Sequence, residues 1–309
     1  MTWKPIIAGV DGSPESLRAA ALAWRIAEAG GAKCYFVFAA PEPWPGGVEP
    51  LHYPPRIYDQ LVADVRRLLE EGLRGEIPAV GREALVVRSG RPGVVLADVA
   101  KERGAELVVV GGRHHGALMR SLGGSTAHYL VRTLDTPVLV VGPGARPMRR
   151  VLVAADLSEA ARPALAAARR YAEVLGAQLR AVHVVEPAKF PTVVPLSIDE
   201  AEYERRCRDV FEGLGPPPDQ VVRRGIAVDA IAEEAARWEA DLIVVGSHGK
   251  GWAERMLIGS TTERLLNLLP ASLLVVPVLR PARRRPVRAR RARTGRARGP
   301  RGPKGKVIV

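Results

Sequence analysis

The chain has 309 residues, which is enough for about two ordinary domains, and 47% of them are hydrophobic, which excludes a peptide or a disulfide-stapled miniprotein. The net charge of +13 is typical of a nucleic-acid binder, but segment 280–309 holds eleven Arg, two Lys and no acidic residue. Residues 1–279 are therefore balanced, with 33 basic and 33 acidic side chains, and the folded part of the chain is expected to be neutral.

The first half of the chain alternates short apolar runs with helical patterns. An apolar strand ends at Asp11 and an Ala/Leu-rich helix follows over about 14–30. A second apolar run at 34–40 precedes a charged, helix-like stretch at 56–72. A strand, a Gly turn, an amphipathic helix and a β-branched strand then run to Gly111, and a last strand is predicted at 136–143.

The second half repeats these segments in the same order. Its first strand ends at Asp156, and the following elements are predicted at 159–176, 179–185, 199–213, 221–246 and 271–278. The predicted strands show little alternation between apolar and polar residues, and amphipathic helices separate them. This pattern indicates parallel strands that are buried on both faces. We therefore predict two doubly wound α/β domains with five-stranded parallel sheets, at 1–144 and 145–279, and a disordered Arg-rich tail at 280–309.

Glycines recur at fixed spacing where the fourth strand of each half ends. In the second half Gly246 is followed after two residues by Gly249, and nine residues later by Gly259 and Ser260. Glycine lets backbone N–H groups approach a phosphate, and the positive end of the next helix favours an anion. Ser260 and Glu263 have the spacing of a capping box. A plain turn followed by an N-cap explains this spacing equally well, but the first half repeats it in register, with His114 in place of the second glycine.

The duplicated motif G-x2-G-x9-G-S, with an Asp at the end of the first strand, resembles the universal stress protein family over residues 3–279. The resemblance implies a flavodoxin-like strand order of 3-2-1-4-5 in each half and pairing of the two fifth strands in an intramolecular pseudo-dimer. It also implies that a half with an intact motif binds ATP, with Mg²⁺, without a dedicated catalytic apparatus.

The second half carries the intact motif. By resemblance, Asp156 lies at the ribose or adenine end with Ala154 beside it, and the backbone of Val184 contacts adenine. The phosphates are expected to be surrounded by Gly246, His248, Gly249, Gly259, Ser260 and Thr261. Leu157 departs from the pattern, because the first half has Gly12 at that position.

The first half is the weaker candidate, because an imidazole at His114 could obstruct the phosphate. Its equivalent residues are Gly9, Asp11, Ala39, Gly111, Arg113, Gly124, Ser125 and Thr126. We expect ATP in the second half, with the first half weaker or empty.

Two other functions compete with a nucleotide-dependent stress-response regulator. An interaction scaffold that has lost nucleotide binding would rely on the basic tail, which could contact nucleic acid or an anionic surface without reading sequence. An ATP-consuming enzyme is the least favoured function, because the sequence has no G-x-S-x-G, H-E-x-x-H or Walker motif and indicates no residue as a catalytic base. Association into a further homo-oligomer is left open.

Cysteine usage and the N-terminal sequence predict a cytoplasmic protein. Cys34 and Cys207 have no partner at CxxC spacing, which suits a reducing compartment. The N-terminal residues lack the basic and apolar regions of a signal peptide. Adjacent His114 and His115 have no further ligand at metal-binding spacing, so no metal site is expected.

Overall fold

The computed structural model describes residues 3–41, 55–74, 77, 84–112, 126–144, 147–156, 158–186, 205, 211, 219–248 and 258–278. The predicted tail at 280–309 lies outside these residues. So does the predicted helix at 199–213, except for Arg205 and Phe211, which are both helical. Among the helices that are described, none combines the length and the apolar composition that a membrane crossing requires.

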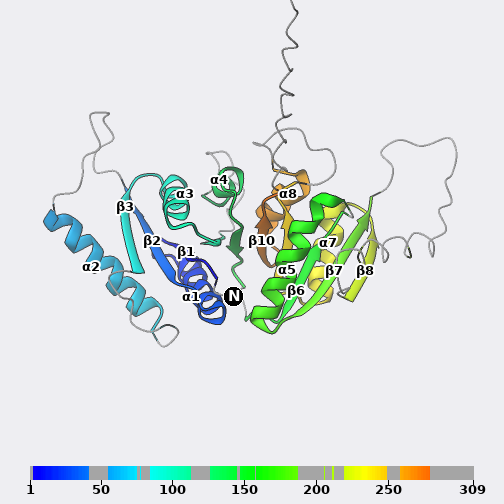
Figure 1. Ribbon diagram of the computed structural model, residues 1–309, viewed down its shortest axis with the longest axis horizontal. Helices are drawn as coiled ribbons and strands as arrows, with labels where there is room; N and C mark the ends of the chain where they lie inside the picture. The colour runs from blue at the N-terminus through cyan, green and yellow to red at the C-terminus, as the bar shows by residue number, and fades with distance from the viewer. Residues whose placement is uncertain are drawn as a thin grey trace, which may run out of the picture. The chain divides into compact units, whose positions relative to one another are not determined.

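The predicted alternation of strands and helices is confirmed in both halves (Figure 1). The first half contains β1 (Ile6–Val10), α1 (Pro14–Gly30), β2 (Cys34–Ala40), α2 (Pro55–Gly72), β3 (Leu85–Ser89), α3 (Pro92–Arg103), β4 (Leu107–Gly111), α4 (Thr126–Thr133) and β5 (Val138–Val141). The second half contains β6 (Arg150–Ala154), the short 3-10 helix η3 (Glu159–Ala161), α5 (Arg162–Leu175), β7 (Gln178–Val185), β8 (Asp219–Arg224), α7 (Ala227–Arg237), β9 (Leu242–Gly246), α8 (Ser260–Leu268) and β10 (Ser272–Val276).

The strands form one ten-stranded mixed sheet in the order β3-β2-β1-β4-β5-β10-β9-β6-β7-β8. Each half has the predicted order 3-2-1-4-5, and all pairs within a half are parallel. The two predicted five-stranded sheets are joined because β5 and β10 pair antiparallel, with Leu139 directly opposite Leu274. These two leucines occupy the same position in their halves, so a pseudo-two-fold axis passes between them.

Helices cover both faces of the sheet, as strands that are buried on both sides require. Successive residues of β1 show this, because Ile6 and Ala8 pack in one apolar cluster and Ile7 packs in the other. The first cluster lies under α1, α2 and α5, and the second lies under α3, α4, α7 and α8. Each cluster continues across β5 and β10, so the two halves share their cores.

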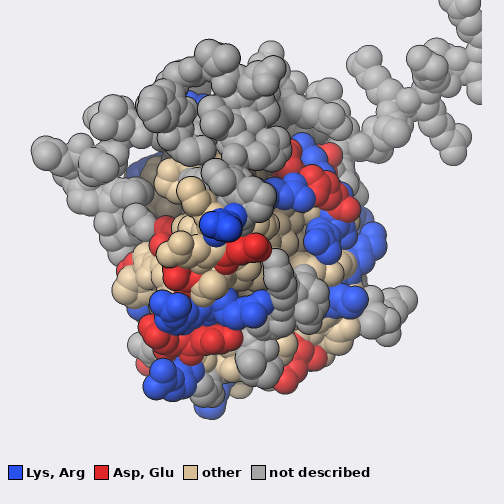
Figure 2. Space-filling model, turned by 90° about the vertical axis from the view of Figure 1, so that its left-hand side faces the viewer, with Lys and Arg blue, Asp and Glu red and all other residues tan. Residues whose placement is uncertain are grey.

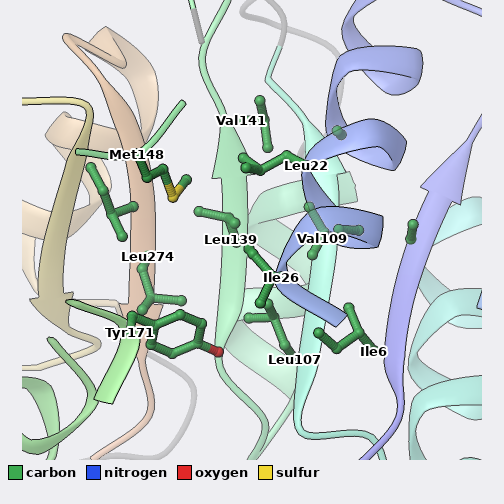
Figure 3. Close-up of a cluster of buried hydrophobic side chains, with 14 of the residues drawn as sticks. Ile6, Leu22, Ile26, Leu107, Val109, Leu139, Val141, Met148, Tyr171 and Leu274 are labelled. Atoms are coloured by element: carbon green, nitrogen blue, oxygen red, sulfur yellow. The ribbon is translucent and has the colours of Figure 1, made fainter. Parts of the chain in front are cut away.

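The junction between the halves is closely packed on the α1 and α5 face (Figure 3). Leu22 and Ile26 of α1 lie beside Leu139 of β5, with Leu274 of β10 and Tyr171 of α5 across the junction. The ring of Tyr171 also meets Trp3 edge-on, with 5.0 Å between the ring centroids. Burial of these side chains stabilises the pair of halves as one unit.

The halves have exchanged the members of one cation–π pair. In the first half Arg103, at the end of α3, lies 4.3 Å from the ring centroid of Tyr35 in β2. In the second half the cation is Arg180 of β7, 4.7 Å from the ring centroid of Trp238 at the end of α7. Arg103 and Trp238 both lie four residues before the next strand, so they are equivalent positions.

A carboxylate replaces an aliphatic side chain in the core of the second half. Glu234 of α7 is fully buried at the position equivalent to Val99 of α3. Arg180 and Arg223 compensate its charge, with N···O distances of 3.0 and 2.6 Å. This buried pairing holds α7 against β7 and β8, beside the strand that carries Val184.

The surface charge agrees with a neutral folded part. Figure 2 shows the face at the β3 edge, where Lys and Arg side chains lie interspersed with Asp and Glu side chains. The ion pair between Arg88 and Glu102 is an example, with an N···O distance of 2.6 Å.

Candidate functional site

The predicted site residues of the second half gather at the carboxyl edge of the sheet. Ala154 ends β6 and Gly246 ends β9, and these strands are parallel neighbours. Asp156 follows β6, where its Oδ1 accepts hydrogen bonds from the backbone N–H of Ser158 at 3.0 Å and from its hydroxyl at 2.6 Å. The carboxylate is thereby held in the turn that follows β6. Strand ends of this kind are where doubly wound folds bind ligands.

The second strand brings Val184 to the same edge. Val182 of β7 pairs in register with Ala154, and Val184 lies two residues further along β7. The side chains of Ala154 and Val184 pack against the apolar cluster under α7 and α8. Ala154 is the last residue of β6 and Val184 is the penultimate residue of β7.

Two hydrogen bonds close the ends of the glycine-containing loop. The carbonyl of Gly246 accepts from the hydroxyl of Thr262 at 2.8 Å, and the carbonyl of Ser247 accepts from the N–H of Gly259 at 2.8 Å. His248 is described, whereas Gly249 lies outside the described residues. Gly246 and Gly259, which are thirteen positions apart in the sequence, are thus brought together at the start of α8.

The start of α8 differs from the predicted capping box. The helix begins at Ser260, its N-cap is Gly259, and no side chain of a described residue caps it. The prediction that Ser260 is the N-cap is therefore wrong by one residue, because Gly259 already has the extended conformation of a cap, with φ −59° and ψ 140°. Thr261 lies in the first turn. An uncapped helix start offers backbone N–H groups to an anion.

The first half has a similar Asp turn. Asp11 accepts from the N–H of Ser13 at 3.0 Å and from its hydroxyl at 2.6 Å, as Asp156 does from Ser158. Gly9, Ala39 and Gly111 lie in β1, β2 and β4, and Thr126 begins α4. Arg113, His114, Gly124 and Ser125 lie outside the described residues, and so does Leu157 of the second half.

The two halves differ in the space at the end of their fourth strand. A Cβ added to Gly111 would lie 2.7 Å from the carbonyl carbon of Glu15 in the first turn of α1. A Cβ added to Gly246 would lie 3.8 Å from the carbonyl oxygen of Ala160, the equivalent of Glu15. The helix that follows the first strand therefore stands closer to the fourth strand in the first half than in the second.

Sequence reasoning missed three residues that distinguish the halves. Thr262, which closes the loop, is replaced by Ala127 in the first half, and Ser247 is replaced by Gly112. Ala160 is replaced by Glu15, a bulkier and charged residue. Superimposing the two copies residue by residue would have revealed these differences, but their role depends on contacts between segments distant in sequence.

The described residues contain no group of three or more His, Cys, Asp or Glu side chains that could hold a metal ion. Burial lowers the pKa of His248, which favours the uncharged ring near neutral pH. Among the described residues, the groups here that suit an anionic ligand are the backbone N–H groups at the uncapped start of α8, beside an imidazole that favours its uncharged form.

Comparison with known proteins identifies relatives of the whole chain. The model of the universal stress protein family matches residues 2–142 and again residues 147–277. Universal stress protein Rv2005c of Mycobacterium tuberculosis is 31% identical over 288 residues, which cover 85% of this chain and 93% of the relative. A universal stress protein of Mycolicibacterium smegmatis is 30% identical over 290 residues, 88% of this chain and 96% of the relative.

A solved structure shares the fold. The crystal structure of a universal stress protein from Archaeoglobus fulgidus superimposes with a TM-score of 0.60 at 20% identity, over 89% of this chain and 98% of that chain. The chain belongs to the universal stress protein family and carries two of its domains in tandem.

Proposed function

We propose that the second half binds ATP and that the protein acts as a stress-response regulator whose state depends on the bound nucleotide. The observation that supports this most is the hydrogen bond between the carbonyl of Ser247 and the N–H of Gly259, which joins the ends of the glycine-containing loop at the uncapped start of α8. A triphosphate is the anion that such a loop and helix start suit.

The expected roles follow the family pattern. Asp156, with Ala154 beside it, would lie at the ribose or adenine end, and the backbone of Val184 would contact adenine. Around the phosphates would lie Gly246, His248, Gly249, Gly259, Ser260 and Thr261. Because Mg²⁺ usually binds phosphate oxygens and water with few protein ligands, it would arrive with the triphosphate.

The second half is favoured over the first for two structural reasons. Gly246 has more room beside Ala160 than Gly111 has beside Glu15. Thr262 closes the second loop, whereas the first half has Ala127 there. We therefore expect about one nucleotide per chain.

Titration calorimetry of the full chain with ATP and Mg²⁺ tests the proposal. Asp156→Ala is expected to abolish binding, and Asp11→Ala is the matched control, because both carboxylates make the same two hydrogen bonds within their turns. Loss of binding in the second-half variant alone supports the proposed site. Equal loss in both variants, or no heat with the native chain, would refute it.

Turnover is tested with radiolabelled ATP. A regulator retains ATP without product, whereas an enzyme of the same architecture releases ADP or another product. The described site offers the neutral His248 and the carboxylate of Asp156, but the position of neither group identifies a base for hydrolysis.

A second candidate function is binding of a polyanion through the tail. It is favoured by the thirteen basic residues of 280–309, set against the balanced charge of residues 1–279. Binding to single-stranded RNA is expected to weaken steeply with salt, because it rests on counterion release and the tail has no aromatic residue for base stacking. Unchanged affinity after deletion of 280–309 would exclude this function, and a preference for anionic vesicles over RNA would assign the tail to membranes instead.

A further inference from the structure

Ser247 uses all of its hydrogen-bonding groups at the start of the proposed phosphate loop. Its N–H donates to the carbonyl of Val276 at 2.8 Å, and its own carbonyl accepts from Gly259. Its hydroxyl oxygen accepts from the N–H of Val278 at 3.1 Å and lies 2.9 Å from Nδ1 of His248. The residue is only 5% exposed, so these protein groups take the place of water.

The proton between the Ser247 hydroxyl and His248 can be assigned from this arrangement. A serine hydroxyl has one proton to donate and two lone pairs. Val278 occupies one lone pair, and among the described residues Nδ1 of His248 is the acceptor within reach of the proton. If Nδ1 itself carried a proton, the buried hydroxyl would lack an acceptor there, which is unfavourable. The hydroxyl therefore donates to Nδ1.

The ring of His248 consequently carries its proton on Nε2. Since Nδ1 faces Ser247, the Nε2–H group on the opposite edge of the ring points away from that residue. Burial lowers the pKa of His248 and so favours the uncharged ring over the imidazolium, while the contact with Ser247 selects the tautomer. The ring is thus a neutral hydrogen-bond donor with a defined orientation.

We propose that Ser247 is a positioning residue for nucleotide recognition, whose hydroxyl fixes the neutral Nε2–H form of His248 so that this N–H donates to a phosphate of the bound nucleotide. This inference rests on the proposed function of the second half. It assigns to His248 an uncharged, oriented contact rather than the diffuse attraction of a cation.

The first half is built differently at the same place. Gly112 is the equivalent of Ser247, and its N–H makes the equivalent bond to the carbonyl of Val141 at 2.8 Å. A Cβ on Gly112 would collide with Cδ1 of Leu269, the C-cap residue of α8 in the other half. Because Leu269 fills this space and position 112 is a glycine, the first half has no hydroxyl at the position of Ser247.

The first test reads the ring of His248 in the full chain without nucleotide. With ¹⁵N-labelled histidine, the spectrum is expected to show Nε2 protonated and Nδ1 accepting a hydrogen bond, and a His248→Gln variant identifies the signals. Ser247→Ala should shift the ring toward a mixture of the two neutral forms, and Ser247→Thr, which keeps the hydroxyl, should restore the native signals. Identical ring signals in the native chain and Ser247→Ala would overturn the proposal.

The second test separates positioning from a loss of structure. Ser247→Ala should weaken ATP binding about three- to tenfold, the effect of one weakened hydrogen bond to a charged group, with near-native affinity in Ser247→Thr. Adenosine has no phosphate, so its affinity should not change. An equal loss for ATP and adenosine would mean that Ser247 is merely structural. If ATP binds equally well to Ser247→Ala, only this inference fails; if the native chain binds no ATP, the proposed function fails as well.

Discussion

Replacing Gly111 by alanine should destabilise the protein far more than the same replacement at Gly246. The Cβ at Gly111 would meet three atoms of Glu15 at 2.7, 2.8 and 2.9 Å, two of which are backbone atoms of α1 that cannot rotate away. At Gly246 the nearest atoms would be the carbonyl oxygen of His248 at 3.2 Å and a methyl group of Val278 at 3.4 Å. The added Cβ at Gly111 therefore requires the backbone of α1 to move, whereas the added Cβ at Gly246 requires only a small shift of its neighbours.

The cost at Gly111 follows from overpacking of a rigid site, about 1–3 kcal/mol, whereas a contact at 3.2 Å should cost no more than about 1 kcal/mol. For a folded unit of this size each kcal/mol lowers the melting temperature by about 2–4 °C. Urea and thermal unfolding of both variants, followed by tryptophan fluorescence, measure the difference. Equal losses of stability in the two variants would refute the argument that the first half is closed at this point.

Three further predictions concern other parts of the molecule. Leu274→Ala at the junction should lower the free energy of unfolding by about 2–5 kcal/mol, because this side chain is fully buried opposite Leu139. Leu268→Ala is the control and should lower it little, because Leu268 is half exposed. Similar urea midpoints for the two variants would contradict a junction held by packing. Because the pKa of His248 is lower in the folded chain than its ordinary value of 6.5, the unfolded state binds more protons, so stability should fall as the pH drops from about 7.5 to about 5.5. His248→Asn should flatten that decrease, measured by urea unfolding at each pH, and an unchanged slope would exclude this histidine as a contributor. Burial raises the pKa of the Cys34 thiol to about 12. In a Cys207→Ser variant, this thiol should therefore react with a thiol reagent at neutral pH only after denaturant is added. Prompt reaction in the native state would mean that β2 opens readily.

The strand order could be predicted because each strand and its boundary carry a local signal. Apolar runs stop at Asp11, Gly111, Asp156 and Gly246, and the structure ends its strands within two residues of each. The antiparallel pairing of Leu139 with Leu274 has no such signal, because similar runs of Leu and Val occur in many strands of the chain. Composition therefore does not show which strand pairs with which. Only the resemblance to a family predicted that pairing.

The site was less predictable than the fold, because its distinguishing contacts are not local. The run around Glu234 reads as an amphipathic helix with two adjacent glutamates, and nothing in it shows that Glu234 is the buried one, facing Arg180 and Arg223. The capping-box prediction at Ser260 was wrong because glycine can itself occupy the N-cap. The roles of Ser247 and Thr262 arise from their contacts with β10 and β9, which the spacing of glycines does not reveal.

Covalent fusion of the two copies through one chain has a consequence for stoichiometry. In a symmetric dimer of identical single domains, every substitution appears twice, so a change that closes one site closes the other. Here the pseudo-two-fold axis between Leu139 and Leu274 relates residues that are free to differ, as Gly112 and Ser247 do. The chain can therefore pack the carboxyl edge of one half more closely than that of the other, as at Gly111 and Gly246, an inequality that a homodimer of this fold cannot encode.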